Sequence, residues 1–401
     1  MNNTTLNLNS KRIQLITWTI LLLFPIIGMA VDLVAPSLPA IANDLDSSSA
    51  IVQNAISFYL IGYGFGNFIG GILTDALGRR KLLLGSLCGF ILVSLCAATI
   101  PYIGILLTAR LFQGLMLGVL SVVVRAILAD ILSAEELVGL GIMIGMMWGL
   151  GPIIGPVIGG YLQVYFGWQA GFYFFSIIGI LGLATAFFII PETHTDPHPL
   201  SLTIVKQNFS ELIAHRQFIA FSILMGLNYS LIIIFNTAGP FLIQTKFHYS
   251  AIQFGRIAMS LGIVFLIATM ISRYLLTKYQ AKQLLSTAVF GFLGLAVFSV
   301  TAVYFLKNNI EFISIISGIM FFACGSIFPL SMGKGLSLFR HIAGSAIATM
   351  YLICTIITST SAALISLVHM QNNIPLTWTY LCLTLVSALI YWKLIHNTKQ
   401  L

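Results

Sequence analysis

Twelve long apolar runs restrict what this chain can fold into more than any other feature. A helix that crosses a bilayer needs about 20 predominantly apolar residues. With 58% hydrophobic and 7% charged residues, the chain is neither a soluble globular protein nor a disordered one. Transmembrane barrels are excluded, because their signature is short alternating segments separated by turns. The sequence therefore predicts an all-α membrane protein with twelve transmembrane helices. The runs lie at 15–41, 50–73, 82–100, 103–129, 137–164, 169–190, 217–243, 252–276, 284–306, 310–331, 343–368 and 376–395.

The positive charges indicate the orientation of these helices. The formal net charge is +8, and fourteen Lys and Arg residues fall in loops on the same side as the N-terminus. Only Lys246 and Lys307 fall in loops on the other side. The positive-inside rule then places both termini in the cytoplasm. The same asymmetry accounts for the basic charge without any nucleic-acid partner.

The longest polar interruption divides the spans six and six. It predicts an N-terminal six-helix bundle at 1–191, a cytoplasmic linker at 192–216 and a C-terminal six-helix bundle at 217–401. A short surface helix is expected at 202–213 in the linker. The halves repeat weakly, since GILTDALGRRKLLL from Gly71 corresponds to SRYLLTKYQAKQLL from Ser272. Two bundles with a binding site at their interface form a known transporter plan.

A single carboxylate, Asp32, lies deep in an apolar run, with Pro36 and Pro39 downstream of it. Charge is so costly in hydrocarbon that an intramembrane acid is a candidate functional site. Arg110, in another run, is its expected partner. If both runs are helices of opposite direction, the two residues lie at depths of roughly 13 and 10 Å, at 1.5 Å per residue. We expect Asp32 to carry a proton and Arg110 to favour its ionised form.

The segment GGILTDALGRRK, residues 70–81, resembles the loop signature between the second and third helices of the major facilitator superfamily. Its glycines allow close helix approach and a tight turn, and its charges can form a network at the cytoplasmic face. LLTARLFQGLMLG in the fourth span resembles the Arg motif of that family. The residues that match are Gly71, Asp75, Gly78, Arg79 and Arg80 in the loop, and Arg110, Gln113, Gly114 and Gly118 in the Arg motif.

The fifth span contains GLGPIIGPVIGG, residues 149–160, which is similar to the helix-five motif of exporters of the antiporter type. Gly151, Gly155 and Gly159 recur every four positions and allow another helix to approach closely. Pro152 and Pro156 weaken the local hydrogen-bond ladder.

A finer resemblance is to the Bcr/CflA branch of drug:proton antiporters. It is carried by VDLVAPSLPAIANDL at 31–45, VQNAISFYLIGYGFGNFIGG at 52–71 and AGPFLIQTKFHYSAIQFG at 238–255. It implies the major facilitator fold and drug efflux coupled to protons. The loop after the eighth span departs from the pattern, because it lacks the Asp and Gly-Arg core of its first-half counterpart.

Other polar residues in the spans are candidates for a cavity or a gate. Arg125 and Asp130, near the inner end of the fourth span, could close on the cluster at Arg79 or remain solvated charges. For the cavity wall the alternative is hydrogen bonding between helices. The candidate cavity residues are Tyr59, Tyr63, Gln113, Asn228 and Asn236.

Several chemistries have no support in the sequence. There is no GxxxxGK[ST] loop, which argues against direct ATP coupling, and no hydrolase constellation. The five cysteines lie in predicted spans without metal-ligand spacing. We therefore expect no enzyme activity, no metal and no cofactor, the proton gradient being the energy source.

The prediction is a bacterial-type inner-membrane exporter of small amphipathic molecules, coupled to protons and expected to act as a monomer. An importer of a metabolite or a siderophore is the alternative, since one fold serves both directions. A receptor without transport is a third reading. Arg110 and Arg125 outnumber Asp32 within the spans, so a neutral or anionic substrate is easier to accept than a strongly cationic one.

Overall fold

A computed structural model describes residues 9–194, 202–306 and 309–396. Twelve helices in this part of the chain are long and apolar enough to cross a membrane. A bilayer core offers no water to backbone groups, so each span satisfies them with its own helical hydrogen bonds. The prediction of an all-α protein with twelve transmembrane helices is confirmed.

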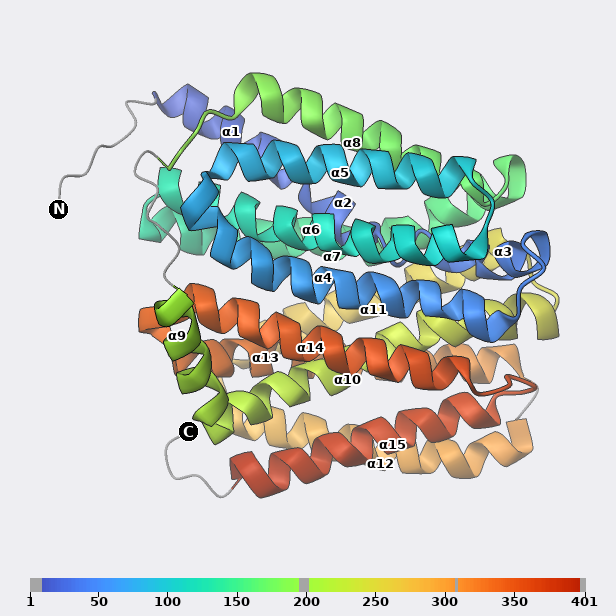
Figure 1. The fold of residues 1–401 in the computed structure, drawn as a ribbon. Helices are drawn as coiled ribbons and strands as arrows, with labels where there is room; N and C mark the ends of the chain where they lie inside the picture. Colours follow the sequence, from blue (N-terminus) through green and yellow to red (C-terminus); the bar gives the residue numbers. More distant parts are fainter. Residues whose placement is uncertain (1–8, 195–201, 307–308, 397–401) are drawn as a thin grey trace.

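The first half of the chain forms the upper layer in Figure 1. Its long helices run nearly antiparallel to one another, and short turns connect them. The elements are α1 (Ser10–Leu21), α2 (Phe24–Met29), η1 (Ala35–Ser37), α3 (Leu38–Asp44), α4 (Ser49–Leu77), α5 (Arg79–Thr99), α6 (Ile103–Ile131), α7 (Ala134–Phe166) and α8 (Gln169–Ile189).

The second half forms the lower layer, and the short helix α9 stands across one end of the molecule (Figure 1). The observed α9 confirms the surface helix expected in the linker. The elements are α9 (Leu202–Ala214), α10 (Arg216–Phe241), η2 (Leu242–Lys246), α11 (Ala251–Leu275), α12 (Ala281–Leu306), α13 (Ile310–Ser337), η3 (Arg340–Ile342), α14 (Ala343–Ser366), α15 (Ile374–Tyr391) and η4 (Trp392–His396).

The first apolar run, expected as one continuous span, is broken into α1, α2, η1 and α3. Proline lies in the first turn of each of the last three pieces: Pro25 in α2, Pro36 in η1 and Pro39 in α3. Proline has no backbone N–H to continue a helix but fits its first turn. Asp32 lies in the turns between α2 and η1. Its depth therefore does not follow from a helical rise.

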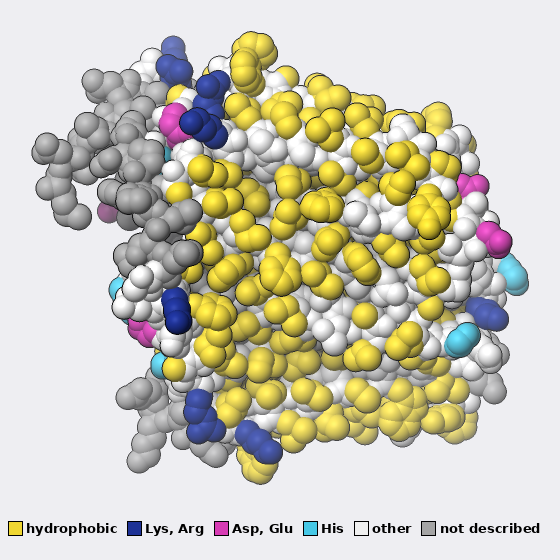
Figure 2. All heavy atoms as spheres, viewed as in Figure 1, with side chains coloured by type: hydrophobic (Ala, Val, Ile, Leu, Met, Phe, Trp, Pro, Cys, Tyr) yellow, Lys and Arg dark blue, Asp and Glu magenta, His cyan; other side chains and the backbone are white. Residues whose placement is uncertain are grey.

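The surface carries a broad apolar belt with charged side chains gathered at its two ends (Figure 2). We call the end at which α4 stops and α5 starts, at Leu77 and Arg79, the basic end; it is at the left in Figures 1 and 2. Most of the Lys and Arg residues visible in this view lie there. The belt is the surface expected of a protein that faces lipid.

The two halves pack mainly through two helix pairs, α4 against α14 and α7 against α11. An added Cβ at Gly255 of α11 would lie 2.4 Å from the carbonyl oxygen of Pro156 in α7. One at Gly160 of α7 would lie 2.5 Å from that of Ala251 in α11. Small residues thus let the backbones of α7 and α11 approach each other closely.

Candidate functional site

A small aromatic cavity lies between the two halves. The first half contributes the rings of Tyr59, Tyr63 and Trp148, and the second half those of Tyr229, Phe328 and Tyr351. Its volume is about 30 Å³. That is room for roughly one or two waters and too little for an organic substrate. The structure therefore shows a contracted form of the site.

Asp32 connects the two halves beside this cavity. Its carboxylate accepts a hydrogen bond of 2.8 Å from Nδ2 of Asn236 in α10. Both side chains are buried, and Val31, next to Asp32, lines the cavity. Near the end opposite the basic end, Nε2 of Gln244 donates to the carbonyl oxygen of Pro36 at 2.9 Å. The broken first span is thus tied to the second half at two points.

The expected pair of Asp32 with Arg110 is not formed. Arg110 is completely buried, and its guanidinium lies 4.4 Å from the ring centroid of Tyr59. It donates to Oε1 of Gln113 at 3.0 Å and to the carbonyl oxygen of Ala55 at 3.3 Å. Its second terminal nitrogen has no hydrogen-bond partner among the described residues. The aromatic face and these acceptors stabilise the cation where a carboxylate was expected.

Two of the candidate cavity residues lie elsewhere. Gln113 is enclosed within the first half, where its amide donates to Ser94 at 2.8 Å. Asn228 points away from the other half and bonds to Leu224 of its own helix and to Ser387 of α15. Both make the interhelical hydrogen bonds that were the alternative for such residues. Tyr59 and Tyr63 do line the cavity. Asn236 is not part of the lining but is hydrogen-bonded to Asp32 beside it.

The helix-five motif in α7 presents two different faces. An added Cβ at Gly151 would lie 2.3 Å from the carbonyl carbon of Gly28, and one at Gly159 would lie 2.0 Å from the carbonyl oxygen of Leu33. At Gly155 it would lie 3.3 Å from Cβ of Asp32. The glycines thus pack against the segment that carries Asp32. Pro152 and Pro156 are on the other face, against Gly262 and Gly255 of α11, in the second half.

At the basic end, the loop motif is held by a charge network. Nε of Arg79 lies 3.3 Å from Oδ2 of Asp130, which also accepts a 2.7 Å hydrogen bond from Thr193. Glu192 caps the start of α5 by accepting from the backbone N–H groups of Arg79 at 2.9 Å and Arg80 at 3.1 Å. The side chain of Arg80 donates to a backbone carbonyl of α8 at 2.8 Å. The network therefore fastens the start of the linker to the first half.

Gly78 is required by this arrangement for two reasons. Its φ of +87° lies in the region that disfavours other residues. An added Cβ would also lie 2.7 Å from Oε2 of Glu192. Asp75, expected in the same network, has a side chain outside the described part of the structure. Arg125 is not in the network, and its guanidinium lies 5.4 Å from the ring centroid of Tyr351 in α14.

A sequence profile described as the Major Facilitator Superfamily matches residues 20–362. The chain belongs to this superfamily. A relative named bicyclomycin resistance protein homolog, from Haemophilus influenzae, is 28% identical over 390 residues, covering 96% of each chain. The multidrug resistance protein MdtL of Shewanella sp. is 28% identical over 340 residues, covering 84% of this chain and 83% of the relative. The resemblance to the Bcr/CflA branch is confirmed.

Solved structures show the same major facilitator fold. A D-xylose–proton symporter superposes with a TM-score of 0.79 at 16% identity, covering 96% of this chain and 99% of the symporter. An inward-open form of the E. coli xylose transporter gives a TM-score of 0.73 at 16% identity, covering 97% of each chain. This superfamily member is therefore a multi-pass membrane transporter.

Sequence reasoning missed several residues that the fold brings together. Glu192 and Thr193 follow the sixth span, where they read as the start of a polar linker. The acidic residue directly after a span was the available signal for a cap, since α5 starts with two arginines and no acceptor of its own. The cavity rings Trp148, Tyr229 and Tyr351 carried no signal, because aromatic residues are common throughout the spans.

Proposed function

We propose that this transporter exports small amphipathic organic molecules, with proton uptake driving the export by alternating access. It would operate in a bacterial-type inner membrane with both termini in the cytoplasm, as a monomer. The observation that carries the proposal is the buried Asp32–Asn236 hydrogen bond, which joins the two halves beside an aromatic cavity. The efflux-related names of the two relatives support the choice of substrate class.

Protonation of Asp32 is the proposed coupling step. A hydrogen bond to an ionised acceptor is roughly twice as strong as one between neutral groups. Adding a proton to Asp32 therefore weakens its bond to Asn236, and with it one connection between the halves. A proton that enters down a membrane potential supplies about 2.3 kcal/mol per 100 mV. Arg110, stacked on Tyr59, would place a fixed positive charge behind the cavity wall.

The aromatic lining favours substrates with flat apolar surface. Six rings surround the cavity, and stacking on such rings contributes about 0.5–1.5 kcal/mol per pair beyond area burial. No carboxylate lines the cavity in the described part of the chain, and Arg125 contacts its wall at Tyr351. Neutral or anionic aromatic compounds are therefore preferred over strongly cationic ones.

The direction of transport is tested in membrane vesicles of both orientations with an imposed pH gradient. We expect an aromatic drug to move opposite to the proton. Movement in the same direction as the proton would reject export and establish the importer. Substrate movement that is independent of the gradient would reject proton coupling itself.

A further inference from the structure

A second cavity lies at the basic end, within the second half. It has a volume of about 450 Å³ and lies between the ends of α11 and α13, beside the start of α12. Its polar lining comes from Thr269, Ser272, Arg273, Lys334 and Ser337. The size falls in the range of small-molecule sites, and none of the lining residues also lines the aromatic cavity between the halves.

The cations in this cavity lack the carboxylates that neutralise their counterparts in the first half. There, Arg79 is paired with Asp130, and Glu192 caps the same helix. Glu311 is the sole acid between residues 217 and 401. It lies at the opposite end of α13, roughly 35 Å from Lys334 at 1.5 Å per residue.

Arg273 and Lys334 therefore make no ion pair among the described residues. Glu211, the acid of the linker helix α9, lies 3.3 Å from Nε2 of His341. Ser272 is 7% exposed and lines the cavity beside Arg273. The two cations and the Ser272 side chain of this cavity thus remain to receive an anion from outside the protein.

A close contact between α11 and α13 lies beside this cavity. Pro329 cannot donate to the carbonyl of Gly325, and the hydroxyl of Thr269 in α11 donates to that carbonyl instead, at 3.1 Å. An added Cβ at Gly325 would lie 2.4 Å from the carbonyl oxygen of Phe265. The two helices therefore touch at this point. The basic cavity opens on one side of the contact, and an apolar groove opens on the other.

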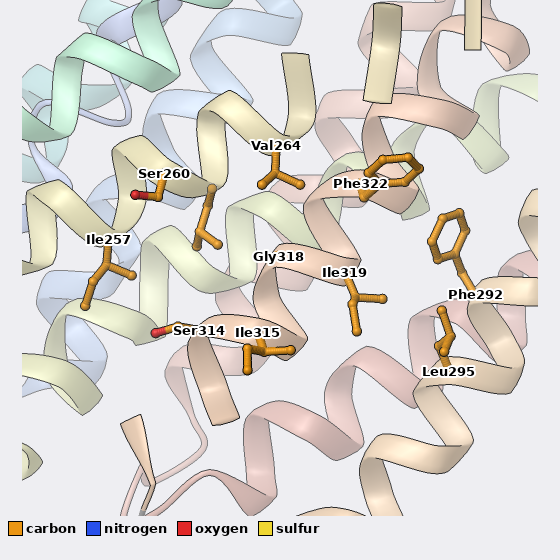
Figure 3. Close-up of a pocket in the computed structure, with 11 residues that line it drawn as sticks. Ile257, Ser260, Val264, Phe292, Leu295, Ser314, Ile315, Gly318, Ile319 and Phe322 are labelled. Atoms are coloured by element: carbon orange, nitrogen blue, oxygen red, sulfur yellow. The ribbon is translucent and has the colours of Figure 1, made fainter. Parts of the chain in front are cut away.

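Figure 3 shows that groove between α11, α12 and α13. It is lined by Ile257, Ser260 and Val264 of α11, Phe292 and Leu295 of α12, and Ser314, Ile315, Gly318, Ile319 and Phe322 of α13. Its volume is about 560 Å³ and its lining is almost entirely apolar. From Arg273 to Ser260 the helical rise is roughly 20 Å. If the phosphate of a membrane lipid lies at Arg273, its acyl chains extend across the roughly 20 Å that separate Arg273 from Ser260.

We infer that the basic cavity binds the phosphate headgroup of an anionic phospholipid, with an acyl chain directed toward the apolar groove. The position fits a lipid of the leaflet that the basic end faces. Two cations that line one cavity, here Arg273 and Lys334, can both form charge-assisted hydrogen bonds with the oxygens of a phosphate. The headgroup is expected to carry a net negative charge. A zwitterionic headgroup also carries a cation, which would be repelled by Arg273 and Lys334.

The test is lipid retention by the delipidated protein in a neutral detergent, measured by native mass spectrometry with dioleoylphosphatidylglycerol as the probe. We expect one tightly held lipid per chain. The double variant Arg273→Gln/Lys334→Gln should weaken this binding roughly tenfold or more. Lys393→Gln removes an exposed cation from the same end outside the cavity, and should leave binding unchanged.

A second variant fills the cavity without altering charge. An added Cβ at Gly333 meets nothing within 4 Å, and leucine is a better helix former than glycine. Gly333→Leu should therefore fold and should also weaken lipid binding. Equal retention of dioleoylphosphatidylcholine, or unchanged binding by both cavity variants, would overturn the inference. Displacement of the lipid by inorganic phosphate at equal concentration would assign the site to a soluble anion instead. Neither readout depends on transport.

Discussion

Asp32 accepts a hydrogen bond from the amide of Asn236 in the other half. Substitutions at Asp32 and at Asn236 therefore test two different parts of the proposed coupling. Asp32→Asn keeps the shape and an acceptor for Asn236 but cannot titrate. We expect substrate binding to remain and proton-coupled transport to be lost. Substrate-induced proton release from solubilised protein is the measurement, and Asp46→Asn, at an exposed acid, is the matched control. Active efflux by the Asp32 variant at the normal rate would show that another group carries the proton.

Asn236→Ala removes the donor to Asp32 and leaves a buried carboxylate without that partner. A hydrogen bond to a charged group contributes about 1.5–3 kcal/mol. The contracted form should therefore lose population by about tenfold or more relative to forms in which the halves separate. Accessibility of a cysteine placed in the cavity wall reports the shift. Asn228→Ala, which removes an asparagine bonded within one half, should produce no such change; equal shifts in both variants would contradict the assignment.

The two faces of α7 make this helix the mechanical link between Asp32 and the second half. Replacing Gly155 by Leu places a side chain where Cβ alone approaches Asp32 to 3.3 Å. Overpacking of this kind costs about 1–3 kcal/mol. We expect proton leak or loss of net transport, measured as uncoupled pH equilibration in proteoliposomes.

Gly145→Leu is the control for that substitution on the same helix, because an added Cβ there meets nothing within 4 Å. It should transport normally. If both leucine variants leak equally, the defect belongs to α7 in general and the close contact at Gly155 is irrelevant.

The network at the basic end predicts a different kind of defect. Glu192→Gln keeps the shape of the side chain but replaces one of the two acceptor oxygens by an NH2 group and removes the charge that caps α5 beside Arg79. Turnover should fall several-fold while equilibrium binding of substrate changes little. Rates and dissociation constants measured on the same preparation separate the two. Glu135→Gln, at an exposed acid on α7, is the comparison, and a loss of affinity in the Glu192 variant alone would contradict the proposed role.

The helices themselves were predictable, because a bilayer selects long apolar runs and every run became a span. The break at Asp32 was only partly readable. Pro25, Pro36 and Pro39 were visible in the sequence, but the unbroken apolar run suggested a single helix. The pairing of Asp32 with Asn236 spans 204 residues. Spans that are apolar on all sides have no hydrophobic periodicity to indicate which face packs against which neighbour. The prediction of Arg110 as the partner of Asp32 was therefore wrong.

The whole molecule is closed near the end opposite the basic end by the contact of Pro36 with Gln244. Cysteines at Ser37 and Gln244, joined by a short bis-maleimide in a background without the five native cysteines, should stop transport. Cysteines at Asp44 and Gln169 lie near that end but within one half, and joining them should have little effect. Transport that survives the first cross-link would show that the halves need not separate there.

The volume of the central cavity also bears on how inhibitors of this transporter should be sought. A cavity that accommodates about one or two waters is too small to bind an organic compound in the contracted form of the protein. Any ligand that binds there must first select a wider form, and its measured affinity is reduced by the rarity of that form. Screening against variants that favour separated halves, such as Asn236→Ala, should therefore reveal ligands that the unmodified protein conceals.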